Sequence, residues 1–466
     1  MNSFALARAC ACAAVILPAL LLEVSQSEAA GFAVREQSGS GLGNAFAGGP
    51  TGIEDPSFIY SNPASMGFMA GHQATGYGSY IIPNTKFKED SSSTVLGTPI
   101  TTNSLFEGND DIGRNALVPG AAGMISVTDD IKVGISFNAP FGLLTDNPGG
   151  WVGRYHAEKS QLETININPA VAYRINDRIS IGAGFNAMYA DAELSNAVDF
   201  GTIGTAAIIG NPLIAPLFPT APVPSAQDGR AKLTGDDWGF GGNAGVMFQP
   251  TDNLRLGLAY RSVVKLDIDG DTDFELDSSG VGATLNALTG AFADSDATAE
   301  IDLPETVAFG ANFDLNDEFS FMGQVEWTNW SRFDELRVEF DNAAQGDSVT
   351  EEDWDDSWFF AVGGTYRPAS VEGLTLRLGF AYDQTPVPNR TRTPRVPDED
   401  RYWIAAGVGY VPLPWVSLDL SYTHIFLPDA DIDLDATDTG NTFRGNLSGK
   451  YEADIDIIAL QGTVRF

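Results

Sequence analysis

Most of the chain repeats short segments in which large apolar residues alternate with small or polar residues. The segment from Leu374 to Tyr382 is typical, since every second residue in it is Leu, Phe or Tyr. A period of two places the two kinds of side chain on opposite faces of a β-strand. Fourteen such segments can be counted, beginning near residues 72, 120, 131, 162, 179, 238, 254, 306, 319, 357, 374, 402, 415 and 451. The pattern predicts an all-β protein.

Alternation alone fits two kinds of all-β protein. In a soluble sandwich the bulky face forms the core, whereas in an outer-membrane barrel it contacts lipid and the small, polar face lines the lumen. Several aromatic residues lie at one end of their strands, as expected of rings at a membrane–water interface: Tyr189, Tyr260, Trp327, Tyr382 and Tyr422. The even strand number, the mostly long connections at one end, and a final strand ending on Phe466 also favour the membrane protein. We therefore predict a transmembrane 14-stranded antiparallel β-barrel in the outer membrane of a Gram-negative cell.

The first 29 residues predict a signal peptide. Arg8 precedes an uncharged apolar stretch from Ala9 to Leu22, which is too short to span a bilayer. Small residues at Ser27 and Ala29 then form a cleavage site, which gives a mature start at Ala30. Export in this way agrees with a barrel in the outer membrane.

Residues 30–68 fit no strand, because they are rich in Gly, Ser and Ala and show no sustained alternation. Such a segment is either a disordered tail or a plug that folds back into the barrel. Scattered apolar residues favour something packed: Phe32, Leu42, Phe46, Ile53, Phe58 and Ile59. We expect a signal peptide at 1–29, an N-terminal hatch at 30–68 and the barrel at 69–466.

Two of the long extracellular loops, 200–228 and 266–300, are unusually apolar. The spacing of Val281, Leu285, Leu288 and Phe292 predicts a short amphipathic helix in the second loop. The loops either pack on each other as a cap or form an apolar groove for a hydrophobic ligand, and the two interpretations are compatible. The residues expected to bind such a ligand are Ile203, Ile208, Ile209, Leu213, Ile214, Leu217, Phe218, Leu285, Leu288 and Phe292.

Charge narrows the possible partners. The chain has 26 Lys and Arg against 62 Asp and Glu, a formal net charge of −36. So acidic a protein lacks the basic face that nucleic acid requires. The acids crowd the loops, for example in Glu351–Asp356 and Asp429–Asp438, and acidic outer loops suit divalent-cation bridges to lipopolysaccharide. We expect outer-membrane lipid and lipopolysaccharide as neighbours, no nucleic-acid partner and a monomer.

Catalytic and metal motifs are weak in this sequence. Both cysteines, Cys10 and Cys12, lie in the predicted signal peptide, which excludes disulfides and thiol chemistry from the mature chain. The three histidines are far apart in sequence. Two Gly-x-Gly patterns, at 182–187 and 239–244, lie inside predicted strands and indicate small lumen-facing residues. Alternate aspartates from Asp267 to Asp273 indicate an acidic solvated loop. We expect no enzyme activity, no cofactor and no metal site.

Several motifs resemble the FadL-type family of outer-membrane transporters for long-chain fatty acids and other hydrophobic compounds. Residues 30–45 look like the family's N-terminal hatch, and Asn62-Pro63-Ala64 matches its Asn-Pro-Ala motif. Residues 139–142 resemble the kinked third strand, and 179–190 resemble the fifth. The most specific match covers Thr385–Pro388 and Pro397–Trp403.

The resemblance implies passive uptake of a hydrophobic small molecule. The ligand would be captured in the apolar loop groove and passed to a lumenal pocket beside the hatch. Gating would involve Phe32, Asn62, Pro63 and Ala64. The ligand would then leave sideways through the wall near Pro140, Phe141 and Gly142.

One departure from the family bears on the ligand. Family members that take fatty acids present basic residues near the end of the fifth strand and before the Trp of the tenth. Here the corresponding neighbourhoods carry Asp191 and Asp355, and lumen-facing Arg255, Arg261 or Arg377 would have to substitute. Lumen charges from Asp191, Asp355 and Arg377 therefore suggest a neutral hydrocarbon in place of a fatty acid. The competing functions are an adhesin or structural barrel and a general porin.

Overall fold

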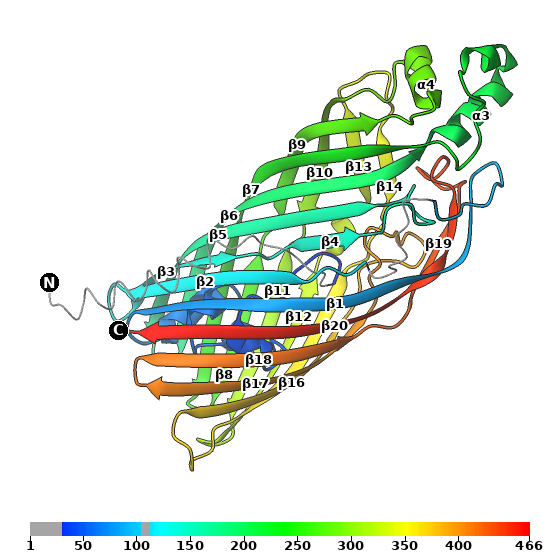
Figure 1. Cartoon of the computed structure of the whole chain (residues 1–466). Coiled ribbons are helices and arrows are strands. Elements are labelled where there is room, and N and C mark those ends of the chain that lie inside the picture. Colours follow the sequence, from blue (N-terminus) through cyan, green and yellow to red (C-terminus); the bar gives the residue numbers. More distant parts are fainter. Residues whose placement is uncertain (1–29, 104–111) are drawn as a thin grey trace.

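The chain folds into a closed antiparallel β-barrel of 14 strands, which confirms the predicted fold class (Figure 1). The computed structural model describes residues 30–103 and 112–466, so the predicted signal peptide lies outside the described residues. It contains 20 strand segments, because six barrel strands are each broken into two. The barrel closes where β1 pairs with β20, from Gln73 opposite Arg465 to Ser93 opposite Asn446.

The eight unbroken barrel strands are β1 (Gln73–Ser93), β2 (Ala116–Ser126), β5 (Lys159–Asn176), β6 (Ile179–Asp199), β7 (Asp228–Thr251), β16 (Leu374–Asp383), β17 (Arg401–Leu413) and β20 (Asn446–Arg465). The six broken ones are β3/β4 (Ile131–Asn138, Gly142–Asp146), β8/β9 (Leu254–Arg261, Val264–Glu275), β10/β11 (Ser295–Leu303, Thr306–Asp314), β12/β13 (Phe319–Thr328, Glu335–Phe340), β14/β15 (Ser348–Glu351, Ser357–Tyr366) and β18/β19 (Val416–Phe426, Ala430–Leu434). A short helix, η6 (Trp330–Arg332), lies in the break between β12 and β13.

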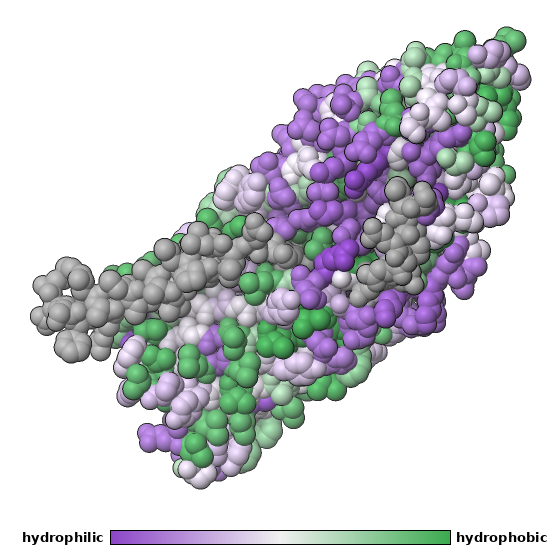
Figure 2. Space-filling model, in the orientation of Figure 1, coloured by the Kyte–Doolittle hydropathy of each residue, from purple (hydrophilic) through white to green (hydrophobic). Residues whose placement is uncertain are grey.

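The two faces of the strands differ as the alternation predicts. In β17, Tyr402, Ile404 and Tyr410 are exposed on the outer wall, whereas Trp403 and Ala405 are fully buried inside. Figure 2 shows hydrophobic residues gathered over the half of the barrel near the C-terminus, and mostly hydrophilic ones on the other half up to the apolar tip formed by α3. The apolar outer band suits lipid, and the polar end suits the cell surface. Among the described residues, no helix is both long and apolar enough to cross a membrane.

Residues 30–68 fill the lumen as a plug, drawn in blue inside the barrel in Figure 1. The hatch consists of short helices: α2 (Gly39–Leu42), η2 (Gly49–Thr51), η3 (Pro56–Ile59) and η4 (Pro63–Phe68). Leu42, Ile59 and Met66 are completely buried. The hatch is therefore a packed core element of the barrel and not a tail.

Glycines on the inner wall make room for the hatch. A Cβ atom on Gly182 would lie 2.4 Å from the backbone nitrogen of Ala64, and one on Gly245 would lie 2.0 Å from Oδ1 of Asn62. A Cβ on Gly379 would lie 2.1 Å from the backbone of Asn44. Strand glycines commonly mark such close approach of another backbone. The pattern around Gly182 is thus a seat for the hatch, in line with its interpretation as small lumen-facing residues.

Two local predictions need correction. The alternate aspartates from Asp267 to Asp273 lie in β9, which extends beyond the apolar band as an exposed strand, so the predicted loop is wrong there. The loop after β6 contains a helix that its sequence did not reveal, α3 (Phe200–Gly210). The apolar residues in and around α3 do not recur at helical spacing along the sequence, so the sequence carried no periodic signal for this helix.

Candidate ligand-binding site

Two helices cover the extracellular end of the barrel (Figure 1). Asp199 begins α3, because its carboxylate accepts a hydrogen bond of 2.8 Å from the backbone N–H of Thr202. The predicted amphipathic helix is α4 (Val281–Thr289), although Phe292 lies beyond its end. Phe200 of α3 and Val281 and Leu285 of α4 are buried against each other. The two apolar loops therefore pack together as a cap.

The ten residues expected to bind ligand divide into three groups. Ile203, Leu285 and Phe292 line a large cavity beneath the cap. Phe218 is buried between the loops, and Ile208 and Ile214 are partly buried there. The other four are exposed on the outer side of the loops: Ile209, Leu213, Leu217 and Leu288. The structure thus brings only part of the predicted set to one cavity.

This cavity, here called the outer groove, has a volume of about 970 Å³. Its walls come from the loops and from the upper strands, and include Val198, Leu194, Leu233, Leu336, Val338 and Phe340. Two arginines, Arg395 and Arg444, also line it. The groove is large enough for a drug-sized or lipid-sized hydrophobic molecule.

A smaller cavity of about 60 Å³ lies next to the hatch, and we call it the inner pocket. Its lining is mostly apolar and includes Phe32, Leu143, Leu162, Ile268, Ile301 and Val396. Four residues line both cavities: Leu194, Leu233, Leu336 and Arg395. The inner pocket is therefore the continuation of the outer groove toward the hatch.

Phe32, at the start of the hatch, is held in a cluster of aromatic rings. Its ring centroid lies 4.7 Å from that of Trp330, 5.5 Å from that of Trp354 and 5.8 Å from that of Phe333. Edge and tilted contacts of this kind are each worth about 0.5–1.5 kcal/mol beyond area burial. The Phe32 ring thus closes the end of the inner pocket that faces the hatch, and three neighbouring aromatic rings hold it there.

The barrel wall is interrupted beside Phe32. β3 ends at Asn138 and β4 begins at Gly142, so Pro140 and Phe141 leave the ladder. The hatch pairs with the freed backbone: Val34 N–H donates to Pro140 O, and Gly142 N–H donates to Phe32 O, both at 2.8 Å. β4 pairs with β5 and has no ladder with β2 among the described residues. The predicted exit residues thus lie at a wall gap that the hatch itself closes.

Charges around the two cavities differ from the sequence-based expectation. Asp191 and Asp355 are exposed and line none of the described cavities, so their assignment as lumen charges is wrong. The buried carboxylate of this region is Glu352, which is 2% exposed and lines the inner pocket. Arg377 does face the lumen, but it forms an ion pair of 2.7 Å with Asp419. Asp191 lies one residue from the inner face of β6, so a register shift of one residue reverses its side, whereas Asp355 lies in the break between β14 and β15.

Arg395 is the charged group that sequence reasoning missed. It is 6% exposed, and its guanidinium donates to Ser160 Oγ at 3.0 Å and to Lys159 O and Asn196 Oδ1 at 3.4 Å. All three acceptors are neutral. Burial lowers the pKa of Arg395 to about 9, so the side chain is still cationic at pH 7. It lies just before the Pro397–Trp403 motif, and that proximity was the available signal.

Burial raises the pKa of Glu352 to about 8, against the opposing effects of the Trp354 N–H and of Arg395 and Arg444. Glu352 is therefore protonated in the folded protein at pH 7 but ionised in the unfolded chain above about pH 4.3. As the pH rises from the unfolded pKa of about 4.3 to the folded pKa of about 8, the free energy of unfolding should fall by up to about 1.4 kcal/mol per pH unit.

We expect Glu352→Gln to remove this part of the pH dependence. The measurement is the denaturation midpoint of the folded barrel in detergent at pH 5 and pH 8. The exposed neighbour Glu351, changed to Gln, is the matched control and should leave the difference between the two midpoints unchanged. An equal pH dependence in wild type and Glu352→Gln would contradict the assignment.

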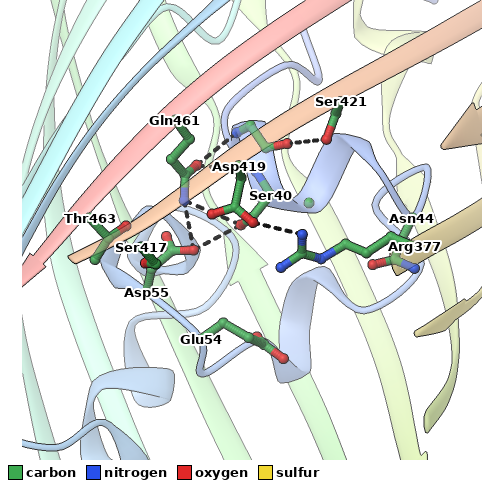
Figure 3. Close-up of polar contacts among 12 residues, drawn as sticks. Ser40, Asn44, Glu54, Asp55, Arg377, Ser417, Asp419, Ser421, Gln461 and Thr463 are labelled. Carbon is green, nitrogen blue, oxygen red and sulfur yellow. Dashed lines mark hydrogen bonds and ion pairs between the residues drawn. The ribbon is translucent and has the colours of Figure 1, made fainter. Parts of the chain in front are cut away.

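Polar contacts fix the hatch to the part of the barrel wall formed by β18 and β20 (Figure 3). The side chain of Gln461 on β20 accepts from Gly39 N–H at 2.8 Å and donates to Asp55 Oδ2 at 2.7 Å. Ser421 Oγ donates to Gly39 O at 2.7 Å. These buried contacts anchor α2 and the segment before η3 to the last barrel strands.

The Asn-Pro-Ala motif anchors the end of the hatch. Asn62 Oδ1 accepts from Ala64 N–H at 3.0 Å and so begins η4, with Pro63 as its first residue. Asn62 Nδ2 donates to Pro50 O at 2.8 Å and to Val246 O at 3.3 Å. The motif therefore has a structural role in the plug, which leaves any part in gating as a prediction.

One group of metal-ligand type occurs among the described residues. His424, Asp454 and Asp456 lie on the outer wall with ligand atoms within 4.8 Å of one another. His424 and Asp456 already bond each other at 2.8 Å, and Asn84 donates to Asp454. None of its three residues lines the outer groove or the inner pocket, so the group is not part of the ligand site.

Comparison with known proteins agrees with this geometry. Residues 20–466 match the family described as outer membrane protein transport protein (OMPP1/FadL/TodX). A long-chain fatty acid transport protein of Escherichia coli O6:H1 is 31% identical over 417 residues, covering 87% of this chain and 89% of the relative. Outer membrane protein P1 of Haemophilus influenzae is 30% identical over 430 residues, covering 88% and 89%.

Solved structures show the same architecture. The crystal structure of a Pseudomonas aeruginosa FadL homologue superimposes with a TM-score of 0.84 at 27% identity, covering 94% of this chain and all of that one. The Pseudomonas putida toluene transporter TodX shares the fold, with a TM-score of 0.64 at 16% identity and 91% and 98% coverage. Family members are transport channels of the outer membrane and not enzymes. This chain belongs to the OMPP1/FadL/TodX family of outer-membrane transport proteins.

Proposed function

We propose that this protein takes up hydrophobic carboxylates, such as long-chain fatty acids, passively across the outer membrane. The observation that carries the proposal is the shared wall of the outer groove and the inner pocket, formed by Leu194, Leu233, Leu336 and Arg395. An apolar chain can move from one cavity to the other along the leucines while its head group stays beside the arginine.

Arg395 favours a carboxylate over the neutral hydrocarbon suggested by the sequence. A buried guanidinium bonded only to neutral acceptors retains its attraction for an anion, and hydrogen bonds that involve an ionised group are about twice as strong as those between neutral groups. The named relatives support this ligand, since the Escherichia coli protein is a long-chain fatty acid transport protein. A hatch that fills the lumen argues against an open general porin.

The proposed route has three steps. The ligand first enters the outer groove beneath the cap of α3 and α4. It then moves to the inner pocket, where Phe32 blocks further passage. Withdrawal of Phe32 and Ala33 from the kink would free the gap at Pro140, Phe141 and Gly142, and the ligand would leave sideways into the membrane.

We expect Arg395→Gln to weaken binding of hexadecanoate by about tenfold or more, because a hydrogen bond to a charged group contributes about 1.5–3 kcal/mol. Binding of hexadecanol, which has the same chain and no charge, should change little. Arg390→Gln is the matched control, since Arg390 lies five residues away and is exposed. Fluorescence displacement on the purified barrel measures both ligands. Equal losses for acid and alcohol, or no loss, would contradict the role of Arg395.

A further inference from the structure

A third cavity lies between the hatch and the barrel wall, beyond Phe32 as seen from the inner pocket. This hatch chamber has a volume of about 100 Å³. The hatch residues Ala33 and Val34 and the kink residues Pro140 and Phe141 form one side of it, and Asn243 and Arg261 lie on the strand side. The chamber therefore adjoins both the site that Phe32 now occupies and the gap in the wall.

Arg261, at the end of β8, is a buried cation bonded only to neutral groups. It is 7% exposed, and its two Nη atoms donate to Asn186 Oδ1 and to Tyr60 O, each at 2.7 Å. The other two lumen-facing arginines predicted as substitutes are paired with acids: Arg255 with Asp314 at 3.9 Å and Arg377 with Asp419 at 2.7 Å. A buried charge is normally paired, because its desolvation is costly.

Among the charged residues that line the chamber, Arg261 is the one for which the described residues offer no acidic partner. Its charged lining residues are Arg35, Arg261 and Glu326. Glu326 is committed to Arg35, whose Nη1 lies 2.7 Å from its carboxylate. Arg35 also pairs with Asp383 at 3.1 Å. With Asp383 counted, the four charges sum to zero, but both acids pair with Arg35 and neither pairs with Arg261. An anion in the chamber would therefore meet a cation that has no acidic partner.

Two buried amide groups next to Arg261 have unpaired donors. Nδ2 of Asn186 and Nδ2 of Asn243 have no hydrogen-bond partner, although the side chains are 0% and 5% exposed. Asn243 stands directly opposite Arg261 in the ladder between β7 and β8. Side chains in such cross-strand pairs are immediate neighbours.

The orientation of both amides is fixed by their partners. Arg261 can only donate, so the Asn186 atom that it contacts is Oδ1, and the nitrogen is the free atom. Asn168 donates its Nδ2 to the carbonyl of Phe185 at 2.9 Å, so the same nitrogen donates to Asn243 Oδ1 at 2.9 Å. The free atom of Asn243 is therefore also its Nδ2. A cation and unpaired N–H donors together match an oxygen anion.

We propose that the hatch chamber is a second binding site for the carboxylate head group, held by Arg261 and the amide of Asn243. The inference rests on the proposed uptake of hydrophobic carboxylates and adds a station between the inner pocket and the wall gap. The head group would pass from Arg395 to Arg261 when Phe32 moves, while the apolar chain follows through the ring-lined site that Phe32 leaves. The amides bind the head group without adding a second full charge, which allows it to leave again.

Crystals soaked with 2-bromohexadecanoate test the site directly, because the bromine marks the position of the carboxylate. We expect an anomalous peak beside Arg261 in addition to one near Arg395, and loss of only the first peak in Arg261→Gln. A parallel soak with bromide ion separates the carboxylate from a free anion. A peak near Arg395 alone, or a peak beside Arg261 with bromide only, overturns the inference and leaves the proposed function standing.

Uptake into cells supplies a second readout. Arg261→Gln should slow hexadecanoate uptake about tenfold and leave hexadecanol uptake unchanged, whereas Arg255→Gln, on the same strand, should affect neither. Asn243→Asp places an acid of the protein opposite Arg261 and should slow the carboxylate in the same way, even where Arg261→Gln folds poorly. Equal slowing of acid and alcohol indicates a structural role and overturns the inference. Failure of the wild-type protein to take up either ligand instead contradicts the proposed function.

Discussion

A disulfide between residues 33 and 141 is expected to stop uptake, and a reductant is expected to restore it. Ala33 and Phe141 form an isolated antiparallel bridge between the hatch and the kink. The bonds from Val34 N–H to Pro140 O and from Gly142 N–H to Phe32 O flank this pair, which makes it a non-hydrogen-bonded pair. Cα atoms in such pairs are about 4.5 Å apart, within the range that a disulfide spans.

The double variant Ala33→Cys, Phe141→Cys would therefore hold the hatch against the wall gap. Both native cysteines lie in the predicted signal peptide, so no other thiol competes. Oxidised cells should take up hexadecanoate at the background rate, and reduced cells at the rate of the double serine variant, Ala33→Ser with Phe141→Ser. That serine control removes the same side chains without a cross-link. Undiminished uptake by the oxidised protein would show that the ligand passes without withdrawal of the hatch start.

The second large effect is expected at Asp398, which lies in the loop between β16 and β17. Its Oδ1 pairs with Arg401 at 2.5 Å, and both side chains are completely buried. Its Oδ2 accepts from Gly31 N–H at 2.8 Å and from Thr385 Oγ1 at 2.7 Å. One carboxylate thus joins the hatch start, the loop and the strand.

Asp398→Asn keeps the shape of the side chain but leaves Arg401 as a buried, unpaired cation. We expect a loss of about 3–5 kcal/mol in the free energy of unfolding, the usual cost of breaking a buried ion pair. Asp353→Asn is the control, because its pair with Arg390 is exposed and such pairs contribute about 0–1 kcal/mol. Denaturant unfolding of the folded barrel in detergent measures both. A loss below about 1 kcal/mol at Asp398 would mean that water or a neighbouring acid reaches Arg401.

The fold was predictable because the strand signal repeats. A period of two over fourteen segments identifies the strands even where each one is weak, and the scattered apolar residues of the hatch favoured a packed plug over a disordered tail. The family resemblance anticipated the break at residues 139–142, but alternation predicted none of the six strand breaks. The kink between Asn138 and Gly142 pairs with the hatch instead of with a neighbouring strand. Such a contact joins residues more than 100 positions apart, so it leaves no local pattern.

The ligand site was predictable only in outline. Apolar composition located the cap, but the faces of α3 and α4 decide which residues line the groove, and that depends on how the loops pack. Asp191 lies one residue from Ala192, which lines the inner pocket, and a change of one residue in register reverses the face of a strand side chain. Glu352 lies in the break between β14 and β15, where alternation gives no orientation. Arg395 lies in a loop without regular structure, where period gives no orientation.

The position of Gln461 links the hatch to the assembly of the barrel. Gln461 lies on β20, the strand that closes the ring by pairing with β1 on one side and β18 on the other. Its side chain also grips Gly39 and Asp55 of the hatch. The strand that closes the ring therefore also holds the hatch, so one side chain takes part in both ring closure and plugging of the lumen. Loss of the Gln461 side chain would loosen the hatch at the seam where the first and last strands of the barrel meet.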